Sequence, residues 1–277
     1  MIHNEFDNEI KYKLFRTITE ILHPSISKKN ISDYKIIIDE DILPVRVFYP
    51  KKVSNLDKAI IYIHGNGKVT DCNEKYSDIC KNITKKADRL LIAIEYEEEK
   101  HKYKKMYEDI YNTVKYLYKG LERNNIDPEN ICLMGDSTGA SIIPVINSLN
   151  KKDINIKKEV LFYPVVTVNH DKYESTKNNS NFNIDLLNNL NEYFSFIACK
   201  KEFKTSMLNP IDLDIKNNPS TLILVGKVDS LRDEIDEYSK KIKNSKFVEI
   251  PFSAHGFLKD MDKELETEVF TEIKKFI

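Results

Sequence analysis

Short apolar runs alternate with longer stretches of helical periodicity through most of this 277-residue chain. The runs are KAIIYIH (58–64), RLLIAIEY (89–96), NICLMG (130–135), KEVLFYP (158–164), STLILVG (220–226) and KFVEI (246–250). Helices are predicted between or after them, at 73–87, 102–123, 138–150, 231–243 and 263–277. Strands this apolar are typical of a sheet buried on both faces, and strands separated by helices pair in parallel. The alternation therefore predicts an α/β fold, with a mostly parallel central sheet, helices on both faces and right-handed crossovers.

The chain departs from this alternation in two places. Before residue 58, apolar spacing predicts an amphipathic helix over 5–22, and two adjacent strands at 34–39 and 43–50 predict an antiparallel hairpin. Between about 165 and 219 an Asn-rich segment is followed by apolar residues at helical spacing, which indicates a small helical cap. We therefore expect a single domain over residues 1–277, with cap elements from about 1–30 and 165–215.

Composition excludes several classes of protein. A net charge of -1 gives no reason to expect binding to nucleic acid or to an acidic membrane surface. No segment reaches the roughly 18 apolar residues that span a bilayer, so stable membrane insertion is not expected. The polar start, MIHNEFDNEIKYK, is unlike a secretory signal, and a cytoplasmic location follows as an expectation. The four cysteines form no CxxC pair, which argues against a zinc site or a disulfide framework.

Glycine is scarce in this chain, and its positions are informative. Six of the seven glycines follow predicted strands of the parallel sheet or flank their ends, and only Gly120 lies elsewhere. Ligands of open parallel sheets bind beyond the carboxyl ends of the strands. Glycines kept at that edge indicate backbone shapes that other residues do not adopt.

One pair of these glycines encloses a serine. The segment Gly135-Asp136-Ser137-Thr138-Gly139 lies between a predicted strand and a predicted helix. G-x-S-x-G in that context is typical of a nucleophile elbow, in which the serine hydroxyl is exposed above the sheet. The alternative is a glycine-bounded turn with a serine that only caps the helix. The remaining motifs favour the elbow.

A nucleophilic serine needs a base, most often a histidine. Two histidines follow Ser137. His170 falls in the polar insert and is expected to be exposed. His255 falls in PFSAHGF, between the last strand and the last helix, from where its ring can reach the elbow. We therefore assign His255 as the base.

The histidine in turn needs a carboxylate that orients it, and the elbow class places this acid between the serine and the histidine. VGKVDSLRDE offers Asp229, Asp233 and Glu234. Asp229 comes first after the strand and lies on the loop, whereas the other two fall in the first helical turn, where the helix dipole favours acids anyway. Asp229 is the preferred candidate.

Attack by such a serine also needs backbone N–H groups that stabilise the developing negative charge, an oxyanion hole. Thr138 follows the nucleophile at a helix N-terminus and supplies one such group. The loop IHGNGK supplies the others, for which we select Asn66 and Gly67. His64 and Gly65 are interpreted as residues that organise this loop, rather than as a second catalytic base.

Four segments together resemble the hormone-sensitive-lipase-like esterases of the α/β-hydrolase fold. They are HGNG (64–67), GDSTGA (135–140), DSLRDE (229–234) and HGF (255–257), in the order and spacing of that family. The resemblance covers roughly residues 35–277. It implies Ser137 as nucleophile, His255 as base and Asp229 as its orienting acid, with an oxyanion hole formed by Asn66, Gly67 and Thr138. The N-terminal helix and the insert resemble the two-part cap of the family.

The segments also depart from the family pattern. Asn66 replaces a glycine of the family's HGGG loop, and Lys68 follows that loop where the family often has an aromatic or apolar residue. EYEEEKHKY (95–103) replaces the family's YRLAPE segment.

The predicted function is that of a serine carboxylesterase, acetyl-esterase-like, which hydrolyses short-chain carboxylic esters through an acyl-enzyme on Ser137. The mechanism needs no metal or cofactor, and the expected partner is a small-molecule ester. Two alternatives stay open: other acyl chemistry on amides, formamides, lactones or acyl acceptors, and a non-catalytic ligand-binding protein on a hydrolase scaffold. The sequence is compatible with a homodimer but does not establish an oligomeric state.

Overall fold

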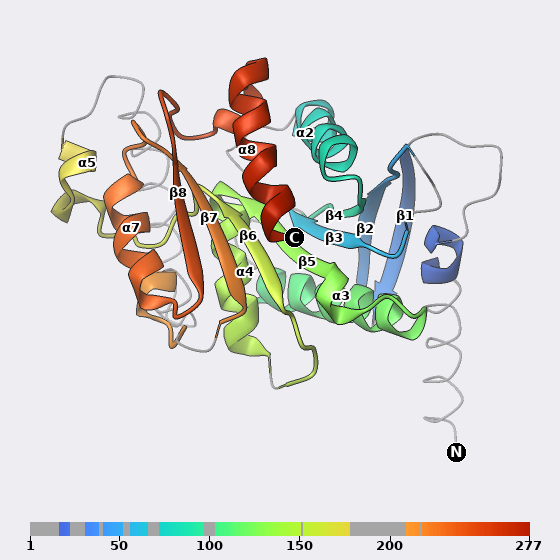
Figure 1. The fold of residues 1–277 in the computed structure, drawn as a ribbon. Helices are drawn as coiled ribbons and strands as arrows, with labels where there is room; N and C mark the ends of the chain where they lie inside the picture. The colour runs from blue at the N-terminus through green and yellow to red at the C-terminus, as the bar shows by residue number, and fades with distance from the viewer. Residues whose placement is uncertain are drawn as a thin grey trace.

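The computed structural model describes residues 17–22, 31–38, 41–51, 56–65, 72–96, 103–150, 152–177, 209–215 and 218–277. Its central feature is an eight-stranded sheet in the order β1-β2-β4-β3-β5-β6-β7-β8 (Figure 1). The strands are β1 (Ile31–Ile38), β2 (Asp41–Phe48), β3 (Ala59–Ile63), β4 (Leu90–Ile94), β5 (Ile131–Asp136), β6 (Lys158–Phe162), β7 (Ser220–Gly226) and β8 (Ser245–Ile250). The pairings from β4 to β8 are parallel, which confirms the predicted fold class.

The N-terminal hairpin forms the antiparallel end of this sheet. β1 pairs with β2, and β2 pairs antiparallel with β4. Both strands begin two or three residues earlier than the sequence predicted. The hairpin thereby continues the sheet beyond β4.

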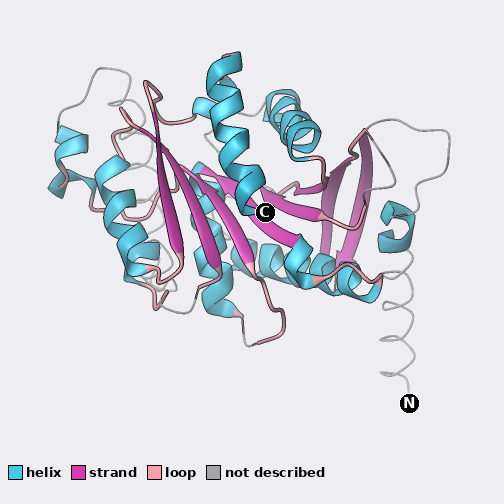
Figure 2. Cartoon of the chain, viewed as in Figure 1, coloured by secondary structure: helices cyan, strands magenta, loops and turns pink. Residues whose placement is uncertain are grey.

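Helices cover both faces of the sheet (Figure 2). They are α2 (Cys72–Ala87), α3 (Tyr103–Arg123), α4 (Ser137–Leu149), α5 (Glu174–Lys177), α7 (Arg232–Lys241) and α8 (Lys263–Phe276). Side chains of α3, α4 and α7 pack in one apolar cluster, and those of α2 and α8 in a second cluster on the opposite face. β3 serves both clusters, because Ile61 and Ile63 point to the first while Ile60 and Tyr62 point to the second.

Of the predicted N-terminal helix, residues 17–22 are described and are helical. Ile18 is fully buried there, against α3. A Cβ on Gly120 of α3 would lie 2.5 Å from Ile18 Cγ1, so this glycine allows the close approach. The one glycine that the sequence placed away from the sheet edge thus has a packing role.

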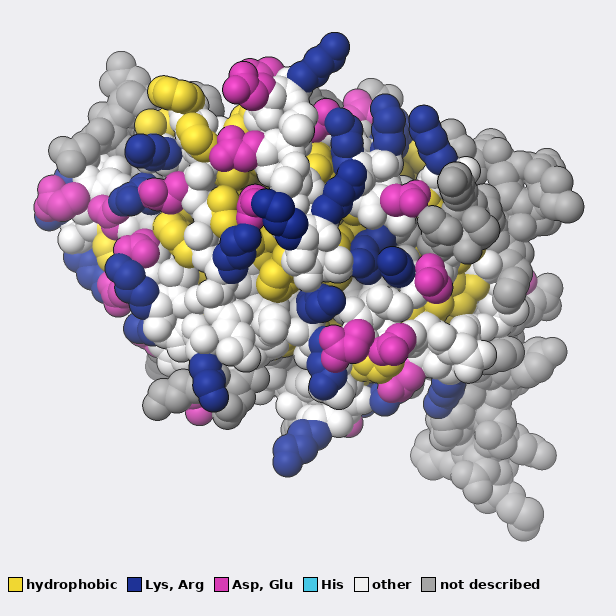
Figure 3. All heavy atoms as spheres, in the orientation of Figure 1, with side chains coloured by type: hydrophobic (Ala, Val, Ile, Leu, Met, Phe, Trp, Pro, Cys, Tyr) yellow, Lys and Arg dark blue, Asp and Glu magenta, His cyan; other side chains and the backbone are white. Residues whose placement is uncertain are grey.

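The surface carries both signs of charge. Among the described residues on the face drawn in Figure 3, Lys and Arg side chains are interspersed with Asp and Glu. Within the described parts of the chain, we find no helix of the length and apolarity that a bilayer crossing requires.

Candidate active site

Ser137 lies at the turn between β5 and α4. β5 ends at Asp136 and α4 begins at Ser137, whose φ of 51° is in the left-handed region. Such a φ is uncommon for a residue with a side chain, and it marks a strained turn. A Cβ on Gly139 would lie 2.3 Å from the carbonyl oxygen of Ile63, and one on Gly135 would lie 2.7 Å from the same atom. The two glycines therefore let the turn pack directly on β3.

The side chains of Ser137, His255 and Asp229 meet at this turn in a hydrogen-bonded chain, which we call the triad. Ser137 Oγ lies 2.9 Å from His255 Nε2, and His255 Nδ1 lies 3.0 Å from Asp229 Oδ2. Because a carboxylate only accepts, Nδ1 carries the proton toward Asp229, and Nε2 is then free to accept from the serine hydroxyl. The sequence placed these three residues at the ends of different strands, and the fold brings them together.

The acid and the histidine are held by their surroundings. Asp229 follows β7, and its fully buried carboxylate also accepts the backbone N–H of Leu231 through Oδ1 at 2.9 Å. The imidazole of His255, in the loop after β8, packs against the ring of Tyr163, with the ring centroids 4.8 Å apart. Its side chain is only 7% exposed. The side chain of each residue is therefore fixed by more than the triad contacts.

Asp136 links the elbow to the loop that follows β3. Its Oδ1 accepts the backbone N–H of Gly65 at 2.9 Å and the hydroxyl of Tyr62 at 2.7 Å. Burial, reinforced by the nearby charge of Asp136, raises the pKa of Tyr62 well above its usual value, so the phenol stays protonated and donates. Sequence reasoning gave Asp136 no role, although an acid at the end of a buried apolar strand is a signal that it needs partners.

His64 has no contact with the triad among the described interactions. Its ring stacks on Tyr96, with centroids 4.6 Å apart, and its carbonyl oxygen accepts the Tyr96 hydroxyl at 2.6 Å. The start of the loop is thus fixed from two sides. Asn66, Gly67 and Lys68 lie outside the described residues. Thr138 is buried in the first turn of α4, where backbone N–H groups have no intrahelical acceptor.

His170 corrects an expectation from the sequence. It was expected to be exposed in the polar insert, but it is 1% exposed, and its Nδ1 lies 2.7 Å from Glu234 Oε2. Burial raises the pKa of Glu234, and the hydrogen bond from His170 opposes that shift. The prediction was wrong because it rested on the polar composition of the insert, whereas the burial of His170 depends on a partner that lies 64 positions away.

The acids at the start of α7 hold the first part of the insert. Asp233 accepts the backbone N–H of Ser175 at 2.8 Å, and the hydroxyls of Ser175 and Thr176 both donate to the carbonyl oxygen of Ser230 at 2.9 Å. Asp233 and Glu234 fall in the first turn of α7, as the sequence predicted. These two acids therefore anchor the insert, while Asp229 contacts His255.

A mostly parallel sheet, with a serine at a strand–helix turn and an acid and a histidine on later loops, defines the class of α/β hydrolases. The family model described as α/β hydrolase fold matches residues 60–259, and the chain belongs to this family. Membership confirms the resemblance to the hormone-sensitive-lipase-like esterases of the α/β-hydrolase fold.

Curated relatives and solved structures agree with this assignment. A protein of Acanthamoeba polyphaga mimivirus named as an α/β hydrolase is 24% identical over 245 residues, covering 83% of this chain and 70% of the relative. Arylacetamide deacetylase of Bos taurus is 30% identical over 148 residues, covering 49% of this chain and 37% of its own length. The esterase of Pyrobaculum calidifontis shares the fold with a TM-score of 0.75 at 20% identity, covering 97% of this chain and 93% of that one. The chain thus spans little more than a third of the deacetylase that it matches.

Proposed function

We propose that this protein is a serine carboxylesterase, acetyl-esterase-like, which hydrolyses short-chain carboxylic esters through an acyl-enzyme on Ser137. The observation that carries the proposal is the hydrogen-bonded chain from Ser137 Oγ through His255 to Asp229, on a serine with φ of 51°. Hydrogen bonds of this length place the base within reach of the proton that it removes.

In the proposed mechanism, Ser137 Oγ attacks the ester carbonyl while His255 Nε2 takes the hydroxyl proton. The tetrahedral oxyanion accepts hydrogen bonds from the backbone N–H groups of Thr138, Asn66 and Gly67. His255 then protonates the leaving alkoxide, which departs as the alcohol and leaves an ester on Ser137. A water molecule activated by His255 attacks this ester, and the acid is released.

Two further residues support the chemistry in this proposal. Asp229 keeps His255 in the tautomer that accepts at Nε2, and it stabilises the imidazolium that forms. Asp136 positions the start of the oxyanion loop, because its carboxylate holds the Gly65 N–H directly before Asn66. Neither role needs a metal or a cofactor.

The preference for short acyl chains rests on the modest size of the proposed cap. This cap comprises elements from about 1–30 and 165–215 on a single domain over 1–277. Two hydrogen bonds support a compact cap. The Thr167 hydroxyl and the Val168 backbone N–H donate to Asn209 Oδ1 at 3.0 and 2.8 Å, so the two described ends of the insert lie side by side. The cytoplasmic location and the homodimer stay predictions from the sequence.

Amide hydrolysis is the second candidate function. Several relatives carry the name arylacetamide deacetylase, which refers to amide substrates, and one is named neutral cholesterol ester hydrolase. A panel of matched pairs, p-nitrophenyl acetate against p-nitroacetanilide and then longer acyl chains, separates the two. We expect the ester to be turned over faster at every chain length, with the acetyl ester preferred.

The direct test is labelling by a fluorophosphonate, followed by intact-mass detection and turnover of p-nitrophenyl acetate. Wild type and Ser148→Ala, a serine on the same helix, should each gain one adduct and turn the ester over. Ser137→Ala should do neither. Turnover retained in Ser137→Ala, or no adduct on folded wild type, would refute the assignment and favour a ligand-binding role on a hydrolase scaffold.

A further inference from the structure

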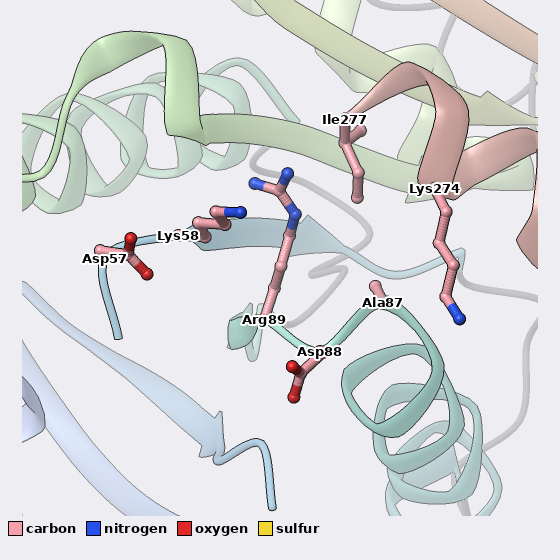
Figure 4. Close-up of a pocket in the computed structure, with 7 residues that line it drawn as sticks. All are labelled: Asp57, Lys58, Ala87, Asp88, Arg89, Lys274 and Ile277. Carbon is pink, nitrogen blue, oxygen red and sulfur yellow. The ribbon is translucent and has the colours of Figure 1, made fainter. Parts of the chain in front are cut away.

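A cavity of about 260 Å³ lies at the edge of the sheet opposite Ser137. Seven residues line it: Asp57, Lys58, Ala87, Asp88, Arg89, Lys274 and Ile277 (Figure 4). Lys58 directly precedes β3 and Arg89 directly precedes β4, whereas Ser137 follows the carboxyl end of β5. A strand of five residues separates these edges by roughly 17 Å, so the cavity is not part of the proposed active site.

Arg89 at this cavity is a buried charge with few partners. The residue is 6% exposed, and its Nη1 donates to the carbonyl oxygen of Asn130 at 3.3 Å. A guanidinium has five N–H donors. Among the described residues, Arg89 forms no ion pair with a carboxylate, although the charge of Asp57 acts on it. Buried arginines are ordinarily paired with an acid, so this one has donors to offer a ligand.

The neighbouring side chains reinforce the positive charge around Arg89. The backbone N–H of Leu90 donates to the carbonyl oxygen of Lys58 at 3.1 Å, which places Lys58 beside Arg89. Figure 4 shows the tips of these two side chains directed toward each other, while the carboxylate of Asp88 points away from the guanidinium. Three cationic and two acidic side chains line the cavity. Burial lowers the pKa of Arg89, and the charge of Asp57 in the cavity lining opposes this shift without cancelling it.

We propose that this cavity binds a phosphate group, free or as the end of a small phosphomonoester, with Arg89 at its base and Lys58 and Lys274 at its rim. The planar fork of a guanidinium matches two phosphate oxygens, and charge-assisted hydrogen bonds of this kind are the strong ones. The volume suffices for a phosphate with some of its water, since a water molecule occupies about 30 Å³. The site is independent of the proposed ester chemistry.

The test measures thermal unfolding of the intact protein against increasing inorganic phosphate, with sodium chloride added to hold ionic strength constant. Wild type should show a rise in Tm that saturates. Lys58→Gln and Lys274→Gln, both at exposed positions, should each weaken the apparent affinity roughly tenfold, as the loss of one charge-assisted contact predicts. Lys263→Gln, an exposed lysine on the same helix α8 outside the cavity, should bind as wild type does.

Two further measurements separate this proposal from the esterase assignment and identify the ligand. Ser137→Ala should keep the phosphate response in full, so failure of the esterase assignment does not affect this test. Glycerol phosphate should saturate the same response if a phosphomonoester is the ligand, whereas a response to inorganic phosphate alone assigns the free ion. No saturable rise over sodium chloride, an unchanged affinity in both lysine variants, or equal saturation by acetate would overturn the proposal.

Discussion

Glu159 gives the sharpest prediction about stability. It lies in β6 with 0% exposure, and its carboxyl accepts the Thr221 hydroxyl at 2.7 Å and Asn147 Nδ2 at 2.8 Å. Burial raises its pKa from 4.5 to about 7, although both hydrogen bonds oppose the shift. The unfolded chain has no such environment, so it releases the proton near the ordinary pKa. Between about pH 4.5 and 7, the folded state therefore retains a proton that the unfolded state has lost.

The sign of the effect follows from that difference. The stability that Glu159 provides is fully present below about pH 4.5 and is lost as pH rises through about 7. At about 1.4 kcal/mol per pH unit, the loss is roughly 3 kcal/mol. Glu159→Gln resembles the protonated acid and lacks this penalty. Its amide can accept from Asn147 and donate to the Thr221 hydroxyl, which keeps the carbonyl oxygen of Pro219 as its acceptor at 2.8 Å.

Urea unfolding at a series of pH values measures this effect. We expect Glu159→Gln to be close to wild type at about pH 4.5 and roughly 3 kcal/mol more stable at about pH 8. Glu268→Gln, at an exposed site on α8, should follow wild type throughout. If the difference between Glu159→Gln and wild type does not change with pH, the folded-state pKa of Glu159 is not raised and the reasoning fails.

Three further predictions concern the acid of the triad, the turn that carries Ser137 and the buried pair that holds the insert. Asp229→Asn should lower kcat for p-nitrophenyl acetate by roughly 10³- to 10⁴-fold with little change in KM, because Asn no longer favours the His255 tautomer that accepts at Nε2; an activity within tenfold of wild type would contradict this role. Gly139→Ala should cost several kcal/mol in urea unfolding or prevent folding, because its Cβ would lie 2.3 Å from a backbone carbonyl oxygen of β3; wild-type stability would show that the turn can yield. Glu234→Ala should destabilise by roughly 1–3 kcal/mol, because it leaves the buried Nδ1 of His170 without its hydrogen-bond partner, whereas a loss below about 0.5 kcal/mol would mean that the pair adds little to stability.

The fold was predictable because its main signals are local. Each strand of the parallel sheet begins and ends within two residues of the predicted apolar run, and α3 spans Tyr103–Arg123 where 102–123 was predicted. Hydrophobic periodicity and glycine position both act over a few residues. The serine, the acid and the histidine could be assigned from the positions of the strands alone, because each of the three follows a strand of the sheet.

The contacts that the sequence did not reveal join distant residues. Asp136 reaches Gly65 across 71 positions, and Glu159 accepts from Thr221 across 62. Glu159 was counted as part of an apolar strand, and nothing in KEVLFYP indicates which partners would satisfy its carboxyl. Pairing of this kind depends on the low dielectric of the interior and on strand register, neither of which is local.

The segment DSLRDE, residues 229–234, contains both a contact that the local sequence predicted and contacts that it did not reveal. Its first acid contacts His255, and its last two hold the insert, with Ser230 between them accepting two hydroxyls from that insert. The spacing places Asp229 on the turn and the other two acids in the first turn of α7. A shift of the insert would therefore be transmitted through five covalently linked residues to the Asp229 carboxylate, which is hydrogen-bonded to His255. For this reason the Glu234→Ala variant should lower kcat as well as stability, even though Glu234 does not contact the triad.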